Sequence, residues 1–242
     1  MTIVSVLTST AEIPSRESME RFAREFLPRE SLSWREVTGG LNVNISGAEV
    51  SLRPVAGPVP NAEADTSAFL SPASMKGWRL GRHSAHLALA LETGGRLASL
   101  EHLTRLTKIS AAVARATGAL GVHWGGGPVT HSLDFFTEIA REAEVPIPAW
   151  VGVSITPEEG GRTSLLSFGM AQRKLPEFWL TAPNAEVPDA FDFFFSALAT
   201  VAERGSAPED GERIPRSLFS RPKVVYAESP VEPGKRVWKV VL

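Results

Sequence analysis

The order of elements between residues 85 and 131 constrains the fold more than any other part of the chain. Apolar and small residues alternate over 85–92, which predicts a strand, and a leucine-rich stripe over 97–117 predicts a helix. That helix should end at Gly118, and a second strand should follow over 119–124. A strand–helix–strand unit favours a right-handed parallel crossover, in which the helix packs on a sheet face.

The other periodicities predict an α+β fold with mixed β-sheets and helices packed on one face. Further strands are expected at residues 3–7, 32–37, 49–53, 150–155, 163–168, 175–180, 223–227 and 236–242, and further helices at 15–27, 132–140 and 189–205. Ser15, Ser132 and Asp189 are the expected N-caps, and Gly160-Gly161 predicts a hairpin turn. The N-terminal strand–helix–strand order resembles the later one, as two related α+β halves would.

A segment rich in proline and small polar residues marks a boundary inside the chain. Residues 56–70 are expected to form a linker or loop, because proline and glycine disfavour both helix and strand. This boundary separates an N-terminal strand–helix–strand region at 1–55 from a main α+β domain at 71–242. The alternative is one continuous domain, which a length of 242 residues also allows.

Composition is that of a soluble globular protein, with 43% hydrophobic and 21% charged residues. The formal net charge of -2 indicates neither a nucleic-acid nor a membrane partner. The chain has no cysteine, which excludes disulfides and thiolate chemistry. The apolar run at residues 1–8 lacks a basic flank and is too short for a signal peptide. We therefore expect a cytoplasmic protein.

The turn Gly125-Gly126-Gly127-Pro128 is the first candidate site, because consecutive glycines suit a sharp bend or a close approach. The turn is expected at the carboxyl end of a parallel strand and before a helix N-terminus, where sheets often bind ligands and anions. The lysine of a P-loop and the G-x-G-x-x-G spacing are both absent. Three interpretations remain, namely a packing turn, a partner-binding loop and a ligand-binding loop.

Four histidines raise the question of a metal site, since His83 lies near His86 and His123 lies near His131. Zinc needs three or four ligands that converge in space. In two parallel strands, His86 would lie near the start of one and His123 near the end of the other, at opposite edges of the sheet. We therefore expect structural histidines, no metal and no cofactor.

A nucleophilic relay is the other chemistry that this region suggests. Thr130, His131, Ser132 and Asp134 include hydroxyl, imidazole and carboxylate groups. They are adjacent in the chain, whereas catalytic triads are assembled from distant segments, and no G-x-S-x-G elbow is present. The sequence therefore predicts no catalytic residues here.

Two segments are candidates for a protein interface. Trp78 lies in the basic, glycine-flanked stretch 76–82, and it could anchor a partner or pack at a domain seam. Glu209, Asp210 and Glu212 belong to a stretch that could steer a basic partner such as a nuclease, or form an ordinary solvated face.

Several of these motifs together resemble an uncharacterised bacterial domain family with a Trp-Gly-Gly segment. The matching motifs are Ala119–Gly126 after a long helix, Thr130-His131-Ser132, Trp150–Val153, Phe168-Gly169, Pro176-Glu177 and Asp210-Gly211. The resemblance covers about residues 80–215. Such proteins look like the immunity proteins of polymorphic-toxin and type VI secretion systems, one group of which is paired with restriction-endonuclease-like toxins.

The resemblance implies an α+β protein that binds and neutralises a cognate toxin, with no cofactor and no catalytic residues. This chain has Glu212-Arg213 where the family pattern has an acidic residue followed by a hydroxyl one, which puts partner specificity in doubt. Contact candidates are the turn Gly125–Pro128, His131, Trp78 and the acidic segment 209–212. The alternative is a small-molecule-binding protein or enzyme that uses the glycine turn and His131.

Overall fold

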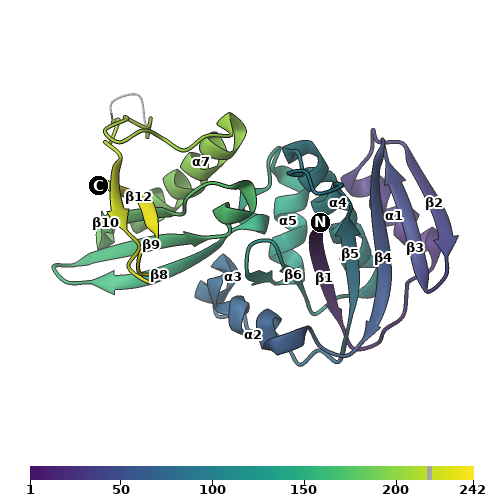
Figure 1. Cartoon of the computed structure of the whole chain (residues 1–242). Coiled ribbons are helices and arrows are strands. Elements are labelled where there is room, and N and C mark those ends of the chain that lie inside the picture. The colour runs from purple at the N-terminus through teal and green to yellow at the C-terminus, as the bar shows by residue number, and fades with distance from the viewer. Residues whose placement is uncertain (217–219) are drawn as a thin grey trace. The chain divides into compact units, whose positions relative to one another are not determined.

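The computed structural model describes residues 1–216 and 220–242, and the chain divides into two compact units. Unit 1 is Met1–Trp150 and unit 2 is Val151–Leu242. Each unit contains one β-sheet with helices, so the predicted α+β class is confirmed (Figure 1). In the part of the chain that the structure describes, no helix is long and apolar enough to cross a membrane.

Unit 1 is built on a seven-stranded sheet. Its strands are β1 (Thr2–Thr8), β2 (Leu32–Val37), β3 (Gly40–Ile45), β4 (Ala48–Ala56), β5 (Ala85–Leu91), β6 (Gly121–Trp124) and β7 (Val129–His131). Their order is β2-β3-β4-β5-β1-β6-β7, and every neighbouring pair is antiparallel. Strands β5 and β6 run in the same direction, as the sequence predicts, but β1 lies between them. The strands of the predicted N-terminal region thus share one sheet with β5, β6 and β7 of the predicted main domain.

Helices cover one face of this sheet. They are α1 (Arg16–Phe26), α4 (Leu100–Thr117), α5 (Leu133–Glu142) and the short α6 (Ile147–Trp150). Ser15 and Ser132 cap α1 and α5, and Gly118 ends α4 in the left-handed conformation, so these three predictions are confirmed. Trp124 stacks on Trp150 at a centroid distance of 5.8 Å, which marks the side of β6 that faces the helices.

Residues 57–82, which we call the covering segment, lie on the opposite face of the sheet. They contain η1 (Pro60–Ala62), α2 (Glu63–Ser67), η2 (Ala68–Leu70) and α3 (Pro72–Met75). Leu7 alternates with the helix-facing Val6 and packs against Val59 and Ala64. The stretch expected as a linker or loop is therefore a set of short helices packed on the sheet. It does not interrupt the sheet, because the following strand β5 pairs with both β1 and β4.

Unit 2 holds a five-stranded sheet in the order β11-β12-β10-β9-β8. Its strands are β8 (Gly152–Glu158), β9 (Arg162–Phe168), β10 (Phe178–Pro183), β11 (Val225–Glu228) and β12 (Arg236–Val241). The β10–β12 pair is parallel and the other pairs are antiparallel. Gly160 and Gly161 form the predicted hairpin turn with φ of 72° and 71°. The strand expected at 150–155 begins at Gly152 because Trp150 still belongs to α6.

One long helix, α7 (Val187–Arg204), packs on the sheet of unit 2. Two 3-10 turns, η3 (Met170–Arg173) and η4 (Asn184–Glu186), precede it. The ring of Phe178 on β10 stacks on the rings of Phe194 and Trp238, with centroid distances of 5.0 and 3.8 Å. The N-cap of α7 is Glu186, three residues before the predicted Asp189, because Pro188 is well suited to the first helical turn.

Candidate functional site

The glycine turn at Gly125–Pro128 joins β6 to β7 in an antiparallel hairpin, whereas the sequence predicts a strand-to-helix turn. The Gly125 N–H donates to the Ile3 carbonyl at 3.1 Å, and an added Cβ would lie 3.2 Å from that oxygen. A side chain at this position would therefore crowd β1, so glycine favours the close approach. Since β7 separates the turn from α5, the turn does not form the helix N-terminus that the anion-site interpretation requires.

His131 is the last residue of β7 in unit 1, three residues after the glycine turn. It is fully buried, its Nδ1 is 2.8 Å from the Ser71 hydroxyl, and its ring packs against Phe135 at 5.0 Å. Burial lowers the pKa of His131 to about 3, so the ring is neutral at pH 7. Thr130 faces the other side of the sheet, and Ser132 caps α5, so the adjacent relay residues do not converge.

The histidines on the other face are brought together, contrary to the prediction that His86 and His123 lie at opposite edges of the sheet. His86 is opposite Leu7 and His123 is opposite Ser5, so the two rings flank β1 on the same face. The prediction failed because β6 has only four residues, which leaves little distance between its start and its end. His83 is also close enough to act electrostatically on His123.

Two of these histidines hold the start of the covering segment. The Val59 N–H donates to His83 Nε2 at 3.3 Å, and His86 Nδ1 lies 3.0 Å from the Gly57 carbonyl. An amide can donate only to an unprotonated ring nitrogen, so Nε2 of His83 is the acceptor in this hydrogen bond. A carbonyl can only accept, so His86 carries its proton on Nδ1. Burial lowers the pKa of His86.

His123 is the centre of a hydroxyl–imidazole–carboxylate constellation that the sequence did not predict. Its Nδ1 lies 3.2 Å from Ser67 Oγ and 2.9 Å from Thr130 Oγ1, and its Nε2 lies 4.0 Å from a Glu63 carboxylate oxygen. Burial, aided by the neighbouring histidines, lowers the pKa of His123 to about 4. The residues come from α2, β6 and β7, so only the pairing of distant segments reveals them.

This constellation is closed rather than open to a substrate. Ser67 is 4% exposed, and its hydroxyl donates to the Glu63 backbone carbonyl at 2.5 Å, one helical turn earlier. The hydroxyl proton is thus directed into the helix backbone, and the imidazole is held in a structural network. Within residues 1–216 and 220–242, no group of three His, Cys, Asp or Glu side chains is placed to hold a metal ion.

Trp78 packs over a glycine of the sheet. A Cβ on Gly121 would lie 3.6 Å from the Trp78 ring and 3.2 Å from Leu80, so the half-buried indole covers this strand. The most exposed apolar side chains of the covering segment were not singled out by the sequence. They are Phe69, 68% exposed, and Met75, 55% exposed. Short helices with few charges give no periodicity that would have revealed them.

The acidic segment of unit 2 is hydrogen-bonded within its own turn and to α7 and β11. Glu212 accepts hydrogen bonds from Arg204 at 2.6 Å and from the Glu209 N–H at 2.8 Å, and Asp210 accepts from the Tyr226 N–H at 3.0 Å. These partners, above all the Arg204 guanidinium, lower the pKa of Glu212. Two of the three carboxylates therefore fix the turn that precedes β11, although the segment stays exposed.

The motif Pro176-Glu177 also has a structural role. The partly buried Glu177 carboxylate accepts from the Ser167 hydroxyl at 2.5 Å and from the N–H groups of Gly169 and Ala171 at 2.9 and 3.3 Å. Ser167 accepts in turn from the Phe178 N–H at 2.8 Å. Burial raises the pKa of Glu177 despite these donors. The motif closes the connection between β9 and β10.

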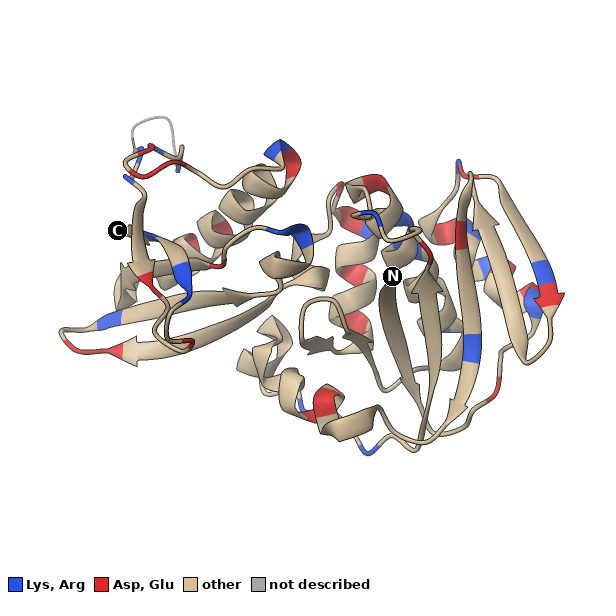
Figure 2. Ribbon diagram, viewed as in Figure 1, with Lys and Arg blue, Asp and Glu red and all other residues tan. Residues whose placement is uncertain are grey.

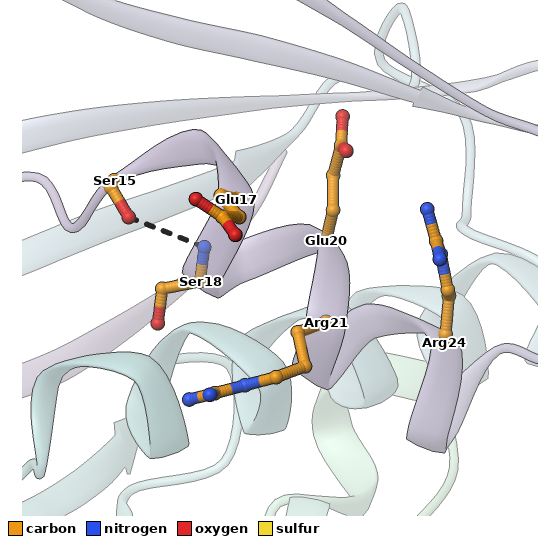
Figure 3. Close-up of a pocket in the computed structure, with 6 residues that line it drawn as sticks. All are labelled: Ser15, Glu17, Ser18, Glu20, Arg21 and Arg24. Atoms are coloured by element: carbon orange, nitrogen blue, oxygen red, sulfur yellow. Dashed lines mark hydrogen bonds between the residues drawn. The ribbon is translucent and has the colours of Figure 1, made fainter.

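An open hollow of about 670 Å³ lies along the exposed side of α1 (Figure 3). Its lining is charged, but the charges and hydroxyls serve the helix itself. Ser15 caps the helix through the Ser18 N–H, Glu20 pairs with Arg16 at 2.7 Å, and the Arg21 guanidinium lies over the neighbouring Phe22 ring. The hollow is thus the surface of an ordinary amphipathic helix.

The fold and the candidate sites define an α+β protein whose buried polar groups hold its segments in place. Comparison of the chain with family models, with characterised proteins and with solved structures finds no match.

Proposed function

We propose that this protein is an immunity protein, which binds a cognate bacterial toxin stoichiometrically in the cytoplasm of the producing cell. The resemblance over residues 80–215 supplies the kind of partner, a nuclease of the restriction-endonuclease-like class delivered by a polymorphic-toxin or type VI secretion system. The protein would cover the active site or the substrate groove of the toxin. It would need neither a cofactor nor direct contact with nucleic acid.

The observation that carries this proposal is a contrast between the polar groups buried beneath the covering segment and the apolar side chains on its outer surface. The groups suited to chemistry, on Ser67, His123 and His131, are buried and bonded to one another, to neighbouring hydroxyls or to the backbone. Phe69 and Met75, by contrast, are large apolar side chains that are 68% and 55% exposed. Neighbouring exposed apolar groups are typical of protein interaction sites, so this pair on adjoining turns supports binding over catalysis.

Co-expression with the protein encoded by the adjacent gene tests the proposal. We expect a one-to-one complex after affinity capture and size-exclusion chromatography, and growth of cells that the neighbour alone would arrest. The matched control is the same strain with an empty vector in place of this protein.

Absence of both the complex and the growth rescue would contradict the proposal for that neighbour. The glycine turn and His131 would then be tested as a ligand site by thermal unfolding with nucleotides and divalent metals. A specific ligand at 100 times its Kd stabilises a protein by about 2.7 kcal/mol, which is readily measured.

A further inference from the structure

We propose that the outer surface of the covering segment is the toxin-binding surface, and that it fits a protein surface where carboxylates surround an apolar hollow. The surface consists of Phe69, Met75, Lys76, Trp78 and Arg79, and we call it the 69–79 patch. This inference rests on the proposed function, since it names the surface by which that function would be performed.

The apolar part of the 69–79 patch has the composition of a binding anchor. Phe69 lies on η2 and Met75 at the end of α3, and a hydrogen bond of 3.1 Å from the Ser74 hydroxyl to the Phe69 carbonyl holds the two turns together. Aromatic residues are enriched among interface anchors, and the pliable methionine side chain adapts to irregular hollows. Trp78 is half-buried, and its backbone N–H donates to the Ala73 carbonyl of α3 at 3.2 Å, so it is attached to the same helix as Met75.

The charged residues of the covering segment that follow Asp65 all have one sign. The chain has no acidic residue between Asp65 and Glu92, whereas Lys76, Arg79 and Arg82 are all exposed. The acidic residues that precede this stretch, Glu63 and Asp65, belong to α2 (Figure 2). A partner that buries Phe69 must therefore bring its own negative charge next to these cations.

The Arg79 side chain is already oriented for a carboxylate. Its Nη1 donates to the backbone carbonyls of Ser74 at 3.0 Å and Trp78 at 2.7 Å, so the guanidinium is fixed against the end of α3. A guanidinium has five N–H donors, and these two bonds leave the Nε and Nη2 groups for a planar acceptor. A partner carboxylate can bind such an edge through two parallel hydrogen bonds.

Buried contacts beneath the patch hold it in one conformation. Ser71 bonds to His131 at 2.8 Å, and Ser67 bonds to His123 at 3.2 Å and to Thr130 at 2.9 Å, so η2 is attached to the sheet at both ends. A surface that is already ordered loses little conformational entropy on binding. This is what a tight, stoichiometric inhibitor requires.

The test measures binding of the purified adjacent-gene product to the full chain by calorimetry, at low and high salt. Two patch variants are Phe69→Ser/Met75→Ser and Lys76→Glu/Arg79→Glu. Their matched controls are Val231→Ser/Val241→Ser and Arg24→Glu/Arg29→Glu, which change equally exposed residues elsewhere. Thermal unfolding midpoints of all four variants should stay close to that of the unmodified protein, because the changed side chains are exposed.

We expect each patch variant to weaken binding at least about 30-fold, which corresponds to about 2 kcal/mol, while the controls bind normally. Added salt should weaken binding of the unmodified protein more than binding of Lys76→Glu/Arg79→Glu.

Three results would overturn the inference. If both patch variants bind as tightly as the unmodified protein, the patch is not part of the interface, and the proposed function is unaffected. Loss of binding in the apolar variant alone would refute the carboxylate-bearing partner. Binding of the free protein to phosphatidylglycerol vesicles, abolished by Lys76→Glu/Arg79→Glu, would instead assign the patch to an anionic membrane. A different result would contradict the proposed function itself. If the unmodified protein does not bind at all, both the proposed function and this inference are wrong.

Discussion

At the scale of single residues, the buried polar side chains of this protein mainly fix connections. Glu177 closes the β9–β10 connection with three donors, and Ser71 ties η2 to the sheet through His131. Each such group is costly to bury alone, and its bonds offset that cost only as a complete set. Loss of one member should therefore leave several partners unsatisfied.

Glu177→Ala should lower the free energy of unfolding of unit 2 by about 2–3 kcal/mol, because the Ser167 hydroxyl and two backbone N–H groups lose their acceptor. Urea unfolding followed by fluorescence measures this change. Glu159→Ala, on the exposed β8–β9 hairpin, is the control and should change stability by less than about 0.5 kcal/mol. Equal stability of the two variants would show that the carboxylate is dispensable.

Gly121→Ala should destabilise unit 1 by about 1–3 kcal/mol, the range for an overpacked site. The new Cβ would lie 2.8 Å from the His131 carbonyl, which is backbone and cannot rotate away, and it would also press on Leu80. Gly81→Ala is the matched control, since its Cβ would meet only Leu120 at 3.9 Å. Denaturant midpoints that coincide for the two variants would contradict this packing.

At the scale of elements, local signals and long-range pairing differ in what the sequence predicts. The ends of α1, α4 and α5 were predicted at Ser15, Gly118 and Ser132, because a cap is a contact within one turn. The place of β1 between β5 and β6 was not, since strand pairing joins residues far apart in the chain. The candidate site was predicted least well, because the short strand β7 makes the glycine turn part of a hairpin instead of a strand-to-helix loop.

The covering segment should loosen in acid, because its contacts need neutral histidines. The pKa of His123 is about 4 in the folded protein against 6.5 in a free histidine, so the unfolded chain binds the proton more readily between these values. Stability is therefore complete above pH 6.5 and falls as the pH decreases toward 4. At about 1.4 kcal/mol per pKa unit, protonation of His123 alone would lower the free energy of unfolding by about 3 kcal/mol.

Urea unfolding between pH 7 and pH 4 measures this loss. His123→Gln should flatten the pH dependence relative to the unmodified protein, since glutamine does not titrate. If that variant does not fold, NMR titration of the unmodified protein replaces it, and the His123 ring signals should still be those of a neutral imidazole at pH 5. A ring that titrates near pH 6.5 would disprove the enclosed arrangement.

At the scale of the whole molecule, the boundary between the units lies after Trp150. The Trp150 indole N–H donates to Thr107 at 2.7 Å, which fixes this residue in unit 1. The sequence placed a boundary at residues 56–70 instead, because proline and glycine usually mark connections. In this chain residues 57–70 belong to the covering segment, and composition does not reveal its buried contacts.

Fragments test which boundary is physical. Residues 1–150 and residues 151–242, produced separately, should each unfold cooperatively in urea, because each keeps its sheet and its helices. Residues 71–242 should not do so as a whole, since β5 loses β4 and β1, its partners on both sides. A cooperative transition of the 71–242 fragment at the stability of the full chain would favour the boundary predicted from sequence.

The arrangement of the covering segment has an evolutionary consequence. Phe69 and Met75 project from a scaffold whose order depends on residues beneath them, so selection can change the outward side chains at almost no cost in stability. His123 and His131 have no such freedom, because any replacement must fill the same enclosed, hydrogen-bonded positions. A protein built in this way can follow a changing partner through a few surface substitutions while its fold stays constant.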